Sequence, residues 1–142
     1  MMTFWSGTDA RVLGGLAFLA MAGSTQAATL GEEARFVINP LGGSDFEVIR
    51  LQQMGASELW CAAASYVEVR RGLSETTPIY LRSPLGPAGT AKGKRGVVFS
   101  LNKAGLPAAQ KRNTLTVKVP GVMVKSAVAR RFCRDAFTRS TK

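Results

Sequence analysis

The chain of 142 residues contains only two cysteines, Cys61 and Cys133, and each lies in a segment whose pattern predicts a helix. A disulfide between them would join two helices that lie 72 residues apart in the sequence. Closing a loop of that length restricts the unfolded chain, which stabilises the fold by an amount on the order of 4 kcal/mol. Formation of the bridge depends on the compartment in which the chain folds.

The N-terminal segment predicts export. Residues 12–23 (VLGGLAFLAMAG) form an apolar run that follows Arg11 and is too short to span a membrane. Small residues at Thr25 and Ala27 fit the pattern that signal peptidase cleaves, so residues 1–27 are predicted to be a signal peptide cleaved after about Ala27. The alternative is a buried N-terminal helix. Because no later stretch is long and apolar enough to be a transmembrane segment, we expect a periplasmic or secreted protein.

An exported chain meets an oxidising compartment, so the sequence predicts a disulfide between Cys61 and Cys133. The competing interpretation is reactive-thiol chemistry, which needs a neighbouring base or a C-x-x-C pair that the sequence does not offer. Histidine is absent as well, which excludes Ser-His-Asp and Cys-His relays and imidazole metal ligands. We therefore expect no metal site and no cofactor.

Two segments carry helix signals. Residues 57–71 (SELWCAAASYVEVRR) begin at a capping Ser57, have Glu58 in the first turn and are followed by Gly72 as the predicted stop. Apolar side chains recur there at steps of three and four residues, with alanines that permit close packing. Residues 126–137 (SAVARRFCRDAF) are amphipathic, with the cysteine on the apolar face. The second helix is therefore predicted to turn its cysteine toward the first.

Strand candidates surround these helices. Residues 35–38 and 46–51 flank the sequence Asn-Pro-Leu-Gly-Gly, which predicts a hairpin. The remaining candidates are residues 79–82, 96–101, 114–119, where apolar and polar side chains alternate strictly, and 122–124. The pattern predicts one α+β domain over residues 28–142, with two helices packed on one face of a mostly antiparallel sheet of about five strands. Residues 28–33 and 139–142 are expected to be flexible termini.

The charge of the chain is unevenly distributed. Lys and Arg number 19 against 9 Asp and Glu, which gives a net charge of +10. Residues 28–75 hold four bases and seven acids, whereas residues 76–142 hold fourteen bases and one acid. Such asymmetry bears on partners more than on fold. For an exported chain whose aromatic residues lie on apolar faces, nucleic acid is a poor candidate partner, and anionic envelope polymers or lipid head groups are better ones.

Two groups of cations are candidate anion-binding residues. Residues 84–96 (PLGPAGTAKGKRG) place Lys92, Lys94 and Arg95 in a glycine-rich loop, whose backbone amides could also hold a phosphate or carboxylate. The spacing is not that of a P-loop, because only three residues separate its middle glycines and the loop leads into a strand. The alternative for both groups is a solvated surface. The second group lies on the polar face of the second helix and consists of Arg130, Arg131 and Arg134.

Patterns of catalytic residues find little support. Asp45 and Glu47 lie two residues apart on one face of a predicted strand, so their side chains could stand about 7 Å apart. That distance suits the paired carboxylates of a glycosidase, but the same spacing is ordinary on the polar face of a hairpin. Ser100 and Lys103 fit S-x-x-K, yet the serine ends a predicted strand instead of opening the helix that this chemistry needs. The sequence therefore predicts no catalytic residue.

Four features of the chain occur together: Trp60-Cys61-Ala62-Ala63 in the first helix, Arg130-Arg131-Phe132-Cys133 in the last, the signal peptide, and the Gly/Lys/Arg loop before Val97-Val98-Phe99. In these features the chain resembles a group of short exported hypothetical proteins of alphaproteobacteria. The resemblance covers most of residues 45–138. It implies a periplasmic location and supplies no activity, so it assigns no functional residue.

These observations favour a small exported binding protein, and not an enzyme, that engages anionic groups through the basic loop and the helix face. The alternative is a protein-interaction module that binds another periplasmic protein as an inhibitor or assembly factor, which would show a contiguous exposed apolar patch. A small hydrolase that works without histidine is the third hypothesis. It would need a pocket with a titratable group whose pKa is strongly shifted.

Overall fold

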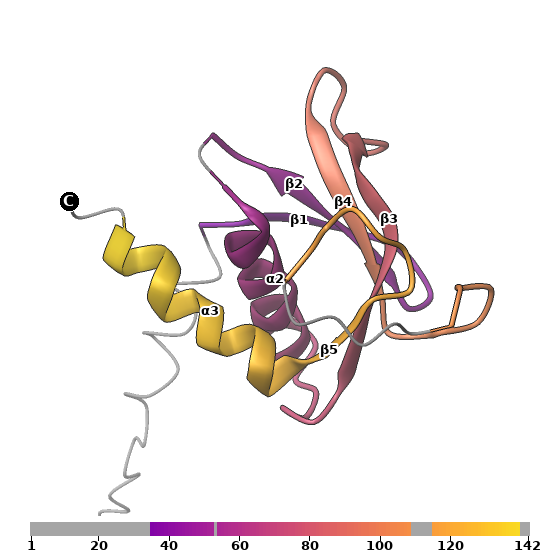
Figure 1. Cartoon of the computed structure of the whole chain (residues 1–142). Helices are drawn as coiled ribbons and strands as arrows, with labels where there is room; N and C mark the ends of the chain where they lie inside the picture. The colour runs from indigo at the N-terminus through magenta and orange to yellow at the C-terminus, as the bar shows by residue number, and fades with distance from the viewer. Residues whose placement is uncertain (1–34, 53, 109–114, 140–142) are drawn as a thin grey trace, which may run out of the picture.

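The computed structural model describes residues 35–52, 54–108 and 115–139, and for residues 134–139 it describes the backbone alone (Figure 1). The predicted signal peptide, the predicted flexible segment 28–33 and residues 140–142 of the predicted flexible segment 139–142 lie outside the described residues, whereas Arg139 ends a helix. Within the described part of the chain, none of the helices combines the length and the apolar character needed to cross a membrane.

Five strands form one antiparallel sheet in the order β1-β2-β4-β3-β5. Their bounds are β1 (Val37–Gly42), β2 (Asp45–Arg50), β3 (Pro78–Pro87), β4 (Arg95–Ser100) and β5 (Met123–Lys125). The predicted β1–β2 hairpin is confirmed, with Gly42 and Gly43 turning the chain at φ of 94° and 57°. Its first strand also includes Pro40, which an edge strand such as β1 tolerates because proline has no N–H to donate.

The predicted strand at 114–119 is wrong for its described part, residues 115–119, which have no strand structure. The side chain of Val117 is buried and that of Lys118 is exposed, so the alternation in the sequence reports burial. The backbone makes single hydrogen bonds instead of a ladder: Leu85 N–H donates to the Val117 carbonyl at 2.9 Å, and the Trp60 indole donates to the Thr116 carbonyl at 3.0 Å. Residues 115–119 therefore form a strap between α2 and β3.

The first helix, α2 (Ala56–Ser65), continues into a π-helical turn, η1 (Tyr66–Arg70). Its N-cap is Gly55 and not the predicted Ser57, because the Glu58 carboxylate reaches back and accepts the Gly55 N–H at 2.8 Å. Gly72 follows the helix with a φ of 62°, which confirms the predicted stop. The second helix, α3 (Ser126–Arg139), extends slightly beyond its predicted end.

The two helices lie on one side of the sheet, as predicted (Figure 1). The first, α2, packs on the sheet, and α3 packs along α2 and reaches β5. Because α2 is covered on both sides, all of residues 59–65 are buried. Cys61 and Cys133 form the predicted disulfide across the helix pair, with Cα atoms 5.0 Å apart. The α+β fold with disulfide-linked helices is therefore confirmed.

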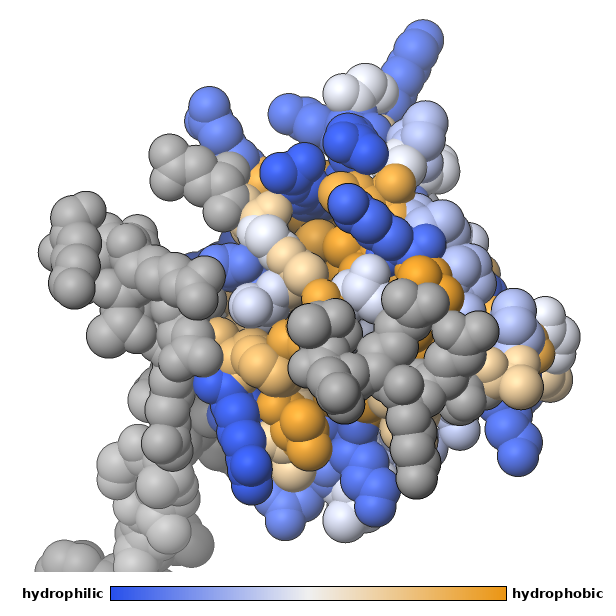
Figure 2. Space-filling model, in the orientation of Figure 1, coloured by the Kyte–Doolittle hydropathy of each residue, from blue (hydrophilic) through white to orange (hydrophobic). Residues whose placement is uncertain are grey.

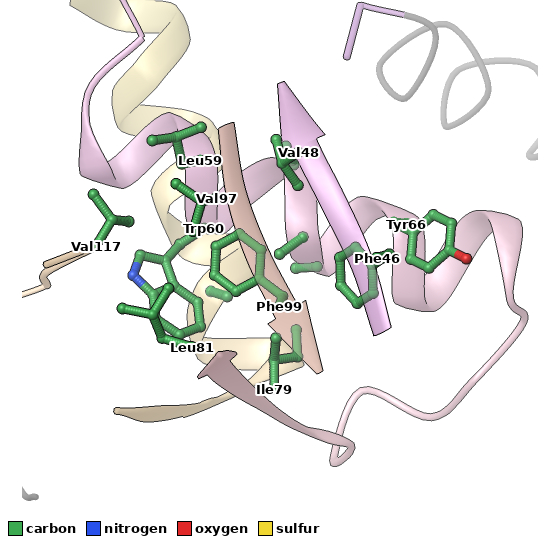
Figure 3. Close-up of a cluster of buried hydrophobic side chains, with 14 of the residues drawn as sticks. Phe46, Val48, Leu59, Trp60, Tyr66, Ile79, Leu81, Val97, Phe99 and Val117 are labelled. Atoms are coloured by element: carbon green, nitrogen blue, oxygen red, sulfur yellow. The ribbon is translucent and has the colours of Figure 1, made fainter. Parts of the chain in front are cut away.

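Aromatic side chains fill the core between α2 and the sheet (Figure 3). Phe46 on β2 and Phe99 on β4 are register partners with ring centroids 5.8 Å apart. Trp60 of α2 meets Phe99 edge-on at 4.8 Å, and Tyr66 of η1 lies 4.3 Å from Phe46. These contacts fix the position of α2 over the middle of the sheet, and with it the N-terminal end of the helix.

Candidate functional site

The structure separates the two groups of predicted anion-binding residues. Lys92 and Lys94 are exposed in the loop that joins β3 to β4, and Arg95 begins β4. The helix α3 packs on α2 and β5, away from that loop (Figure 1). Arg130 lies 3.5 Å from the Glu68 carboxylate and is half-buried, whereas Arg131 is exposed. The side chain of Arg134 lies outside the described residues. The described cations of the loop and of α3 lie apart and do not form one surface.

The backbone amides of the basic loop hold a carboxylate that belongs to the protein itself. Glu47 of β2 is only 2% exposed and accepts N–H groups from Gly89 at 2.8 Å and from Thr90 at 2.9 Å. The Thr90 hydroxyl also donates to this carboxylate and accepts a hydrogen bond from the Asn39 amide. The amides of Gly89 and Thr90, which the sequence offered to an external phosphate or carboxylate, are therefore occupied by Glu47.

This environment keeps Glu47 ionised. Burial acts to raise the pKa of Glu47, but the hydrogen bonds from the Thr90 hydroxyl, the Gly89 N–H and the Thr90 N–H together hold that pKa below its ordinary value. Gly96 makes room for the side chain, because a Cβ at that position would lie 3.0 Å from Glu47 Oε1 and 3.1 Å from its Cγ. A carboxylate enclosed in this way anchors the loop.

Asp45 has partners of its own. The Arg82 Nε lies 3.2 Å from Asp45 Oδ1, and Arg82 Nη2 donates to the carbonyls of Asn102 and Ala104 at 3.2 and 3.0 Å. Arg82 therefore ties the loop after β4 to the sheet. The two carboxylates of the predicted glycosidase-like spacing hold different loops in place.

A cavity of about 650 Å³ opens beside the N-terminal end of α2. Its volume is in the range of small-molecule sites, which is roughly 300–1,000 Å³. The residues that line it come from the end of β2, the start of α2, β3, the start of β4 and the strap. They are the apolar Met54, Leu59, Leu85, Leu115 and Val117, the cationic Arg50, Arg95 and Lys118, and Gly55, Ala56 and Thr116.

Three cations from distant parts of the sequence meet at this cavity. Arg50 and Arg95 are direct partners in the antiparallel register of β2 and β4, so two like charges face each other. The Arg50 Nε donates to the Met54 carbonyl at 2.9 Å, and Arg95 Nη2 lies 3.4 Å from the Leu85 carbonyl. Both contacts are to neutral acceptors. No carboxylate of a described residue lines the cavity, and the Glu58 carboxylate lies beside it, bound to the N–H of the lining residue Gly55.

Hydrophilic side chains surround apolar surface at the top of the view in Figure 2, above the N-terminal end of α2. The nearest carboxylate in sequence, Glu58, is engaged by the Gly55 N–H and does not line the cavity. Of the predicted anion-binding residues, Arg95 lines the cavity, and Lys92 and Lys94 precede it in the exposed loop. Arg50 was not among the predicted residues. It lies in the acidic half of the chain, and only the pairing of β2 with β4 places it next to Arg95.

The structure bears differently on the other chemical possibilities. Within residues 35–52, 54–108 and 115–139, no group of three or more His, Cys, Asp or Glu side chains could hold a metal ion. Ser100, from the S-x-x-K match, is buried, and its hydroxyl donates to the Asn102 carbonyl at 3.0 Å and accepts the Asn102 N–H at 3.1 Å. This serine is engaged in a local turn.

The protein-interaction alternative predicts a contiguous exposed apolar patch. In the part of the chain that the structure describes, the large exposed apolar side chains are spread over β1, the segments after β2 and η1, β5 and α3. They are Val37, Leu41, Leu51, Leu73, Met123 and Val128. The edge of β1 is partly covered, since Arg70 Nη1 donates to the Ile38 carbonyl at 2.8 Å.

Comparisons of the chain with protein-family models, with curated proteins and with solved structures found no match. The resemblance to short exported proteins of alphaproteobacteria therefore stays a prediction, as do the periplasmic location and the absence of an enzymatic activity.

Proposed function

We propose that this protein is a small, non-enzymatic binding protein of the cell envelope, periplasmic or secreted, that engages anionic groups. The observation that carries the proposal is the convergence of Arg50, Arg95 and Lys118 on one cavity that no carboxylate of a described residue lines. Guanidinium groups bind phosphate and carboxylate with paired hydrogen bonds, and a lysine adds a mobile positive charge. Such a site attracts anions.

The surroundings of the cavity support the same proposal. Lys92 and Lys94 are exposed in the loop that leads into β4, so they extend the positive charge beyond Arg95. The exposed Arg131 lies on α3, which packs against α2 and β5. The proposed site is therefore the cavity with its adjoining loop, and the helix face of the sequence hypothesis is not part of it. The disulfide is compatible with an oxidising compartment.

Vesicle sedimentation tests the anion binding. The full chain is mixed with vesicles of phosphatidylglycerol or of phosphatidylcholine at low and high salt. Three double variants each remove two positive charges: R95Q/K118Q at the cavity, K92Q/K94Q in the loop, and K103Q/K125Q as a control at exposed positions elsewhere. Because each variant removes the same number of positive charges, a difference between the variants shows that binding depends on the position of the charges and not on net charge alone.

We expect salt-sensitive binding to phosphatidylglycerol and little binding to phosphatidylcholine. Each cation near an anionic surface contributes about 1 kcal/mol, so R95Q/K118Q should weaken binding roughly 10- to 30-fold. K92Q/K94Q should have a smaller effect, and K103Q/K125Q should change binding less than about 3-fold. Equal losses in all three variants would show that net charge alone acts, and equal binding to both vesicles would refute the proposal.

Export has a separate test. Mass spectrometry of the non-reduced protein from a periplasmic extract should give a chain that begins at about Ala28 and lacks free thiols. Retention of residues 1–27 would contradict the location part of the proposal while leaving the anion-binding part open to the vesicle experiment.

A further inference from the structure

We infer that the cavity beside α2 binds a single-chain amphiphile, with its alkyl chain on the apolar floor and a phosphate monoester head group between Arg50, Arg95 and Lys118. This inference rests on the proposed function, since it uses the same cations, and it adds the class of ligand.

The floor of the cavity indicates the alkyl chain. The half-buried Ala56, Leu85 and Leu115 give the cavity its accessible apolar surface, and Met54 and Val117, which are 7% and 6% exposed, add little to it. A surface that binds only hydrophilic polyanions gains nothing from such a floor. A hydrocarbon chain placed on it removes apolar area from water on both sides of the contact, which favours binding.

The cations indicate a head group with more than one negative charge. Arg50 and Arg95 face each other across β2 and β4, and Lys118 adds a third charge from the strap. A phosphate monoester carries close to two negative charges and has three oxygens that can accept hydrogen bonds from separate donors. A carboxylate carries one charge and two oxygens. The phosphate therefore neutralises more of the repulsion between the two arginines.

Hydrogen bonds within the protein fix the walls of the cavity. The Trp60 indole donates to the Thr116 carbonyl, and Leu85 N–H donates to the Val117 carbonyl, so the strap is fixed to both α2 and β3. Trp60 is itself locked in the aromatic core against Phe99. A site formed in advance loses little conformational entropy when the ligand binds.

Isothermal titration calorimetry of the full chain tests the assignment. The probes are inorganic phosphate, hexyl, octyl and decyl phosphate, and decanoate, each below its micellar concentration. Because the half-buried side chains cover an alkyl chain from one side, every added methylene should tighten binding about 2-fold, which is about 4-fold between successive alkyl phosphates. Decyl phosphate should bind more tightly than decanoate, and the indole N–H signal of Trp60 in NMR spectra should shift on binding.

Two variants locate the ligand. R95Q/K118Q should weaken the binding of decyl phosphate at least 10-fold, whereas K103Q/K125Q should leave it within about 3-fold. Ala56 is half-buried and lines the cavity at the start of α2, so A56F should fill the floor and abolish the dependence on chain length. The alkyl phosphate series on the unchanged protein already tests whether the cavity binds an alkyl chain. The inference therefore stays testable even if A56F does not fold.

The outcomes distinguish this inference from the proposed function. If inorganic phosphate and decyl phosphate bind equally, or neither binds, while binding to phosphatidylglycerol vesicles stays salt-sensitive, the amphiphile assignment is wrong and the anion-binding function stands. If decanoate binds as tightly as decyl phosphate, the phosphate head group is wrong. If decyl phosphate binds but no anionic vesicle does, the envelope function fails and the amphiphile site stands.

Discussion

On the inner face of the sheet, Val48, Val97 and Phe99 are completely buried against α2. On the outer face, Glu47 accepts hydrogen bonds from the loop between β3 and β4, and Asp45 forms an ion pair with Arg82 of β3. The inner face is held by apolar contact with many neighbours at once. The outer face is held by a few directional contacts, each between one carboxylate and its donors. The same β2 strand serves both, because successive side chains alternate between the faces.

This difference decides how each face responds to change. Apolar contact is shared, so the loss of one side chain leaves a cavity that its neighbours fill only in part. A carboxylate contact is specific, so its loss releases one loop and leaves the rest of the sheet intact. The inner face should therefore govern global stability, and the outer face should govern the local order of the loops that flank the proposed site.

The largest effect is expected on the inner side, from the disulfide that ties α3 to α2. The double variant C61A/C133A should lose about 4 kcal/mol of the free energy of unfolding, because the unfolded chain is no longer restricted by the cross-link. Urea denaturation measures this loss of unfolding free energy. The unchanged protein under reducing conditions is the control and should match the variant, and a loss below about 1 kcal/mol would show that the helices hold together without the bond.

The comparison of the two faces is sharpest at Val97 and Val98, which are adjacent on β4. Val97 is completely buried on the inner face, and Val98 is half-buried on the outer face. V97A should cost about 2 to 3 kcal/mol of unfolding free energy, and V98A about 1 kcal/mol or less. Denaturation of both variants under one set of conditions measures the difference. Equal losses would break the distinction between the faces.

Removing the charge of Glu47 should act on the loop more than on the domain. E47Q keeps the volume of the side chain but replaces an ionised acceptor of three hydrogen bonds, which should cost about 1 to 2 kcal/mol. Hydrogen exchange at the amides of Gly89 and Thr90 should speed up severalfold more than exchange in α2. The exposed Glu75 gives the control E75Q, and equal acceleration throughout the chain would contradict a local role.

Acid should reproduce the effect of that variant. Because the pKa of Glu47 is lowered on folding, its contribution to stability is present above the unfolded pKa of about 4.3 and is lost as pH falls through the lower folded value. The amide signals of Gly89 and Thr90 in NMR spectra should stay constant from pH 7 to 5 and shift below about pH 4. E47Q should show no such shift, and a transition between pH 5 and 7 would refute the lowered pKa.

The smallest effect is expected at Asp45. The ion pair with Arg82 is about one-third exposed on the carboxylate side, and water and salt screen it. D45N should lower the free energy of unfolding by less than about 1 kcal/mol and should loosen the loop that Arg82 holds at Asn102 and Ala104. Urea denaturation measures the free energy of unfolding, and hydrogen exchange at the amides of Asn102 and Ala104 measures the loosening of the loop. A loss as large as that of V97A would overturn the ranking of the two faces.

The sequence predicted the parts of the fold that depend on local signals. Glu58 marks the start of α2 and Gly72 follows the end of η1, and the helical spacing places Cys133 toward Cys61, so the helix pair and its disulfide could be predicted. The alternation at 115–119 predicted a strand that does not form. Val117 is buried and Lys118 is exposed, as in a strand, but the backbone makes only single hydrogen bonds, to Leu85 and to Trp60. Side-chain pattern reports burial and does not report hydrogen-bond partners.

The candidate site was only partly predictable for a related reason. Arg95 stands in a basic loop and could be singled out, but Arg50 reaches it only through the pairing of β2 with β4. The contact between Glu47 and Gly89 joins residues 42 positions apart, and no local signal marks it. Contacts of this kind follow from strand register, which the sequence constrains only through the order and spacing of its strands.

The hydrogen bonds between Glu47 and the loop also keep external anions away from the loop amides. Glu47 is a competitor tethered to the same chain, so it meets the loop amides at an effective concentration in the millimolar range or above. A free anion at micromolar concentration cannot displace it from the N–H groups of Gly89 and Thr90. In the proposed function, selectivity for external anions therefore comes from the side chains around the cavity. The occupied amides give a fixed shape to the loop that carries Lys92 and Lys94.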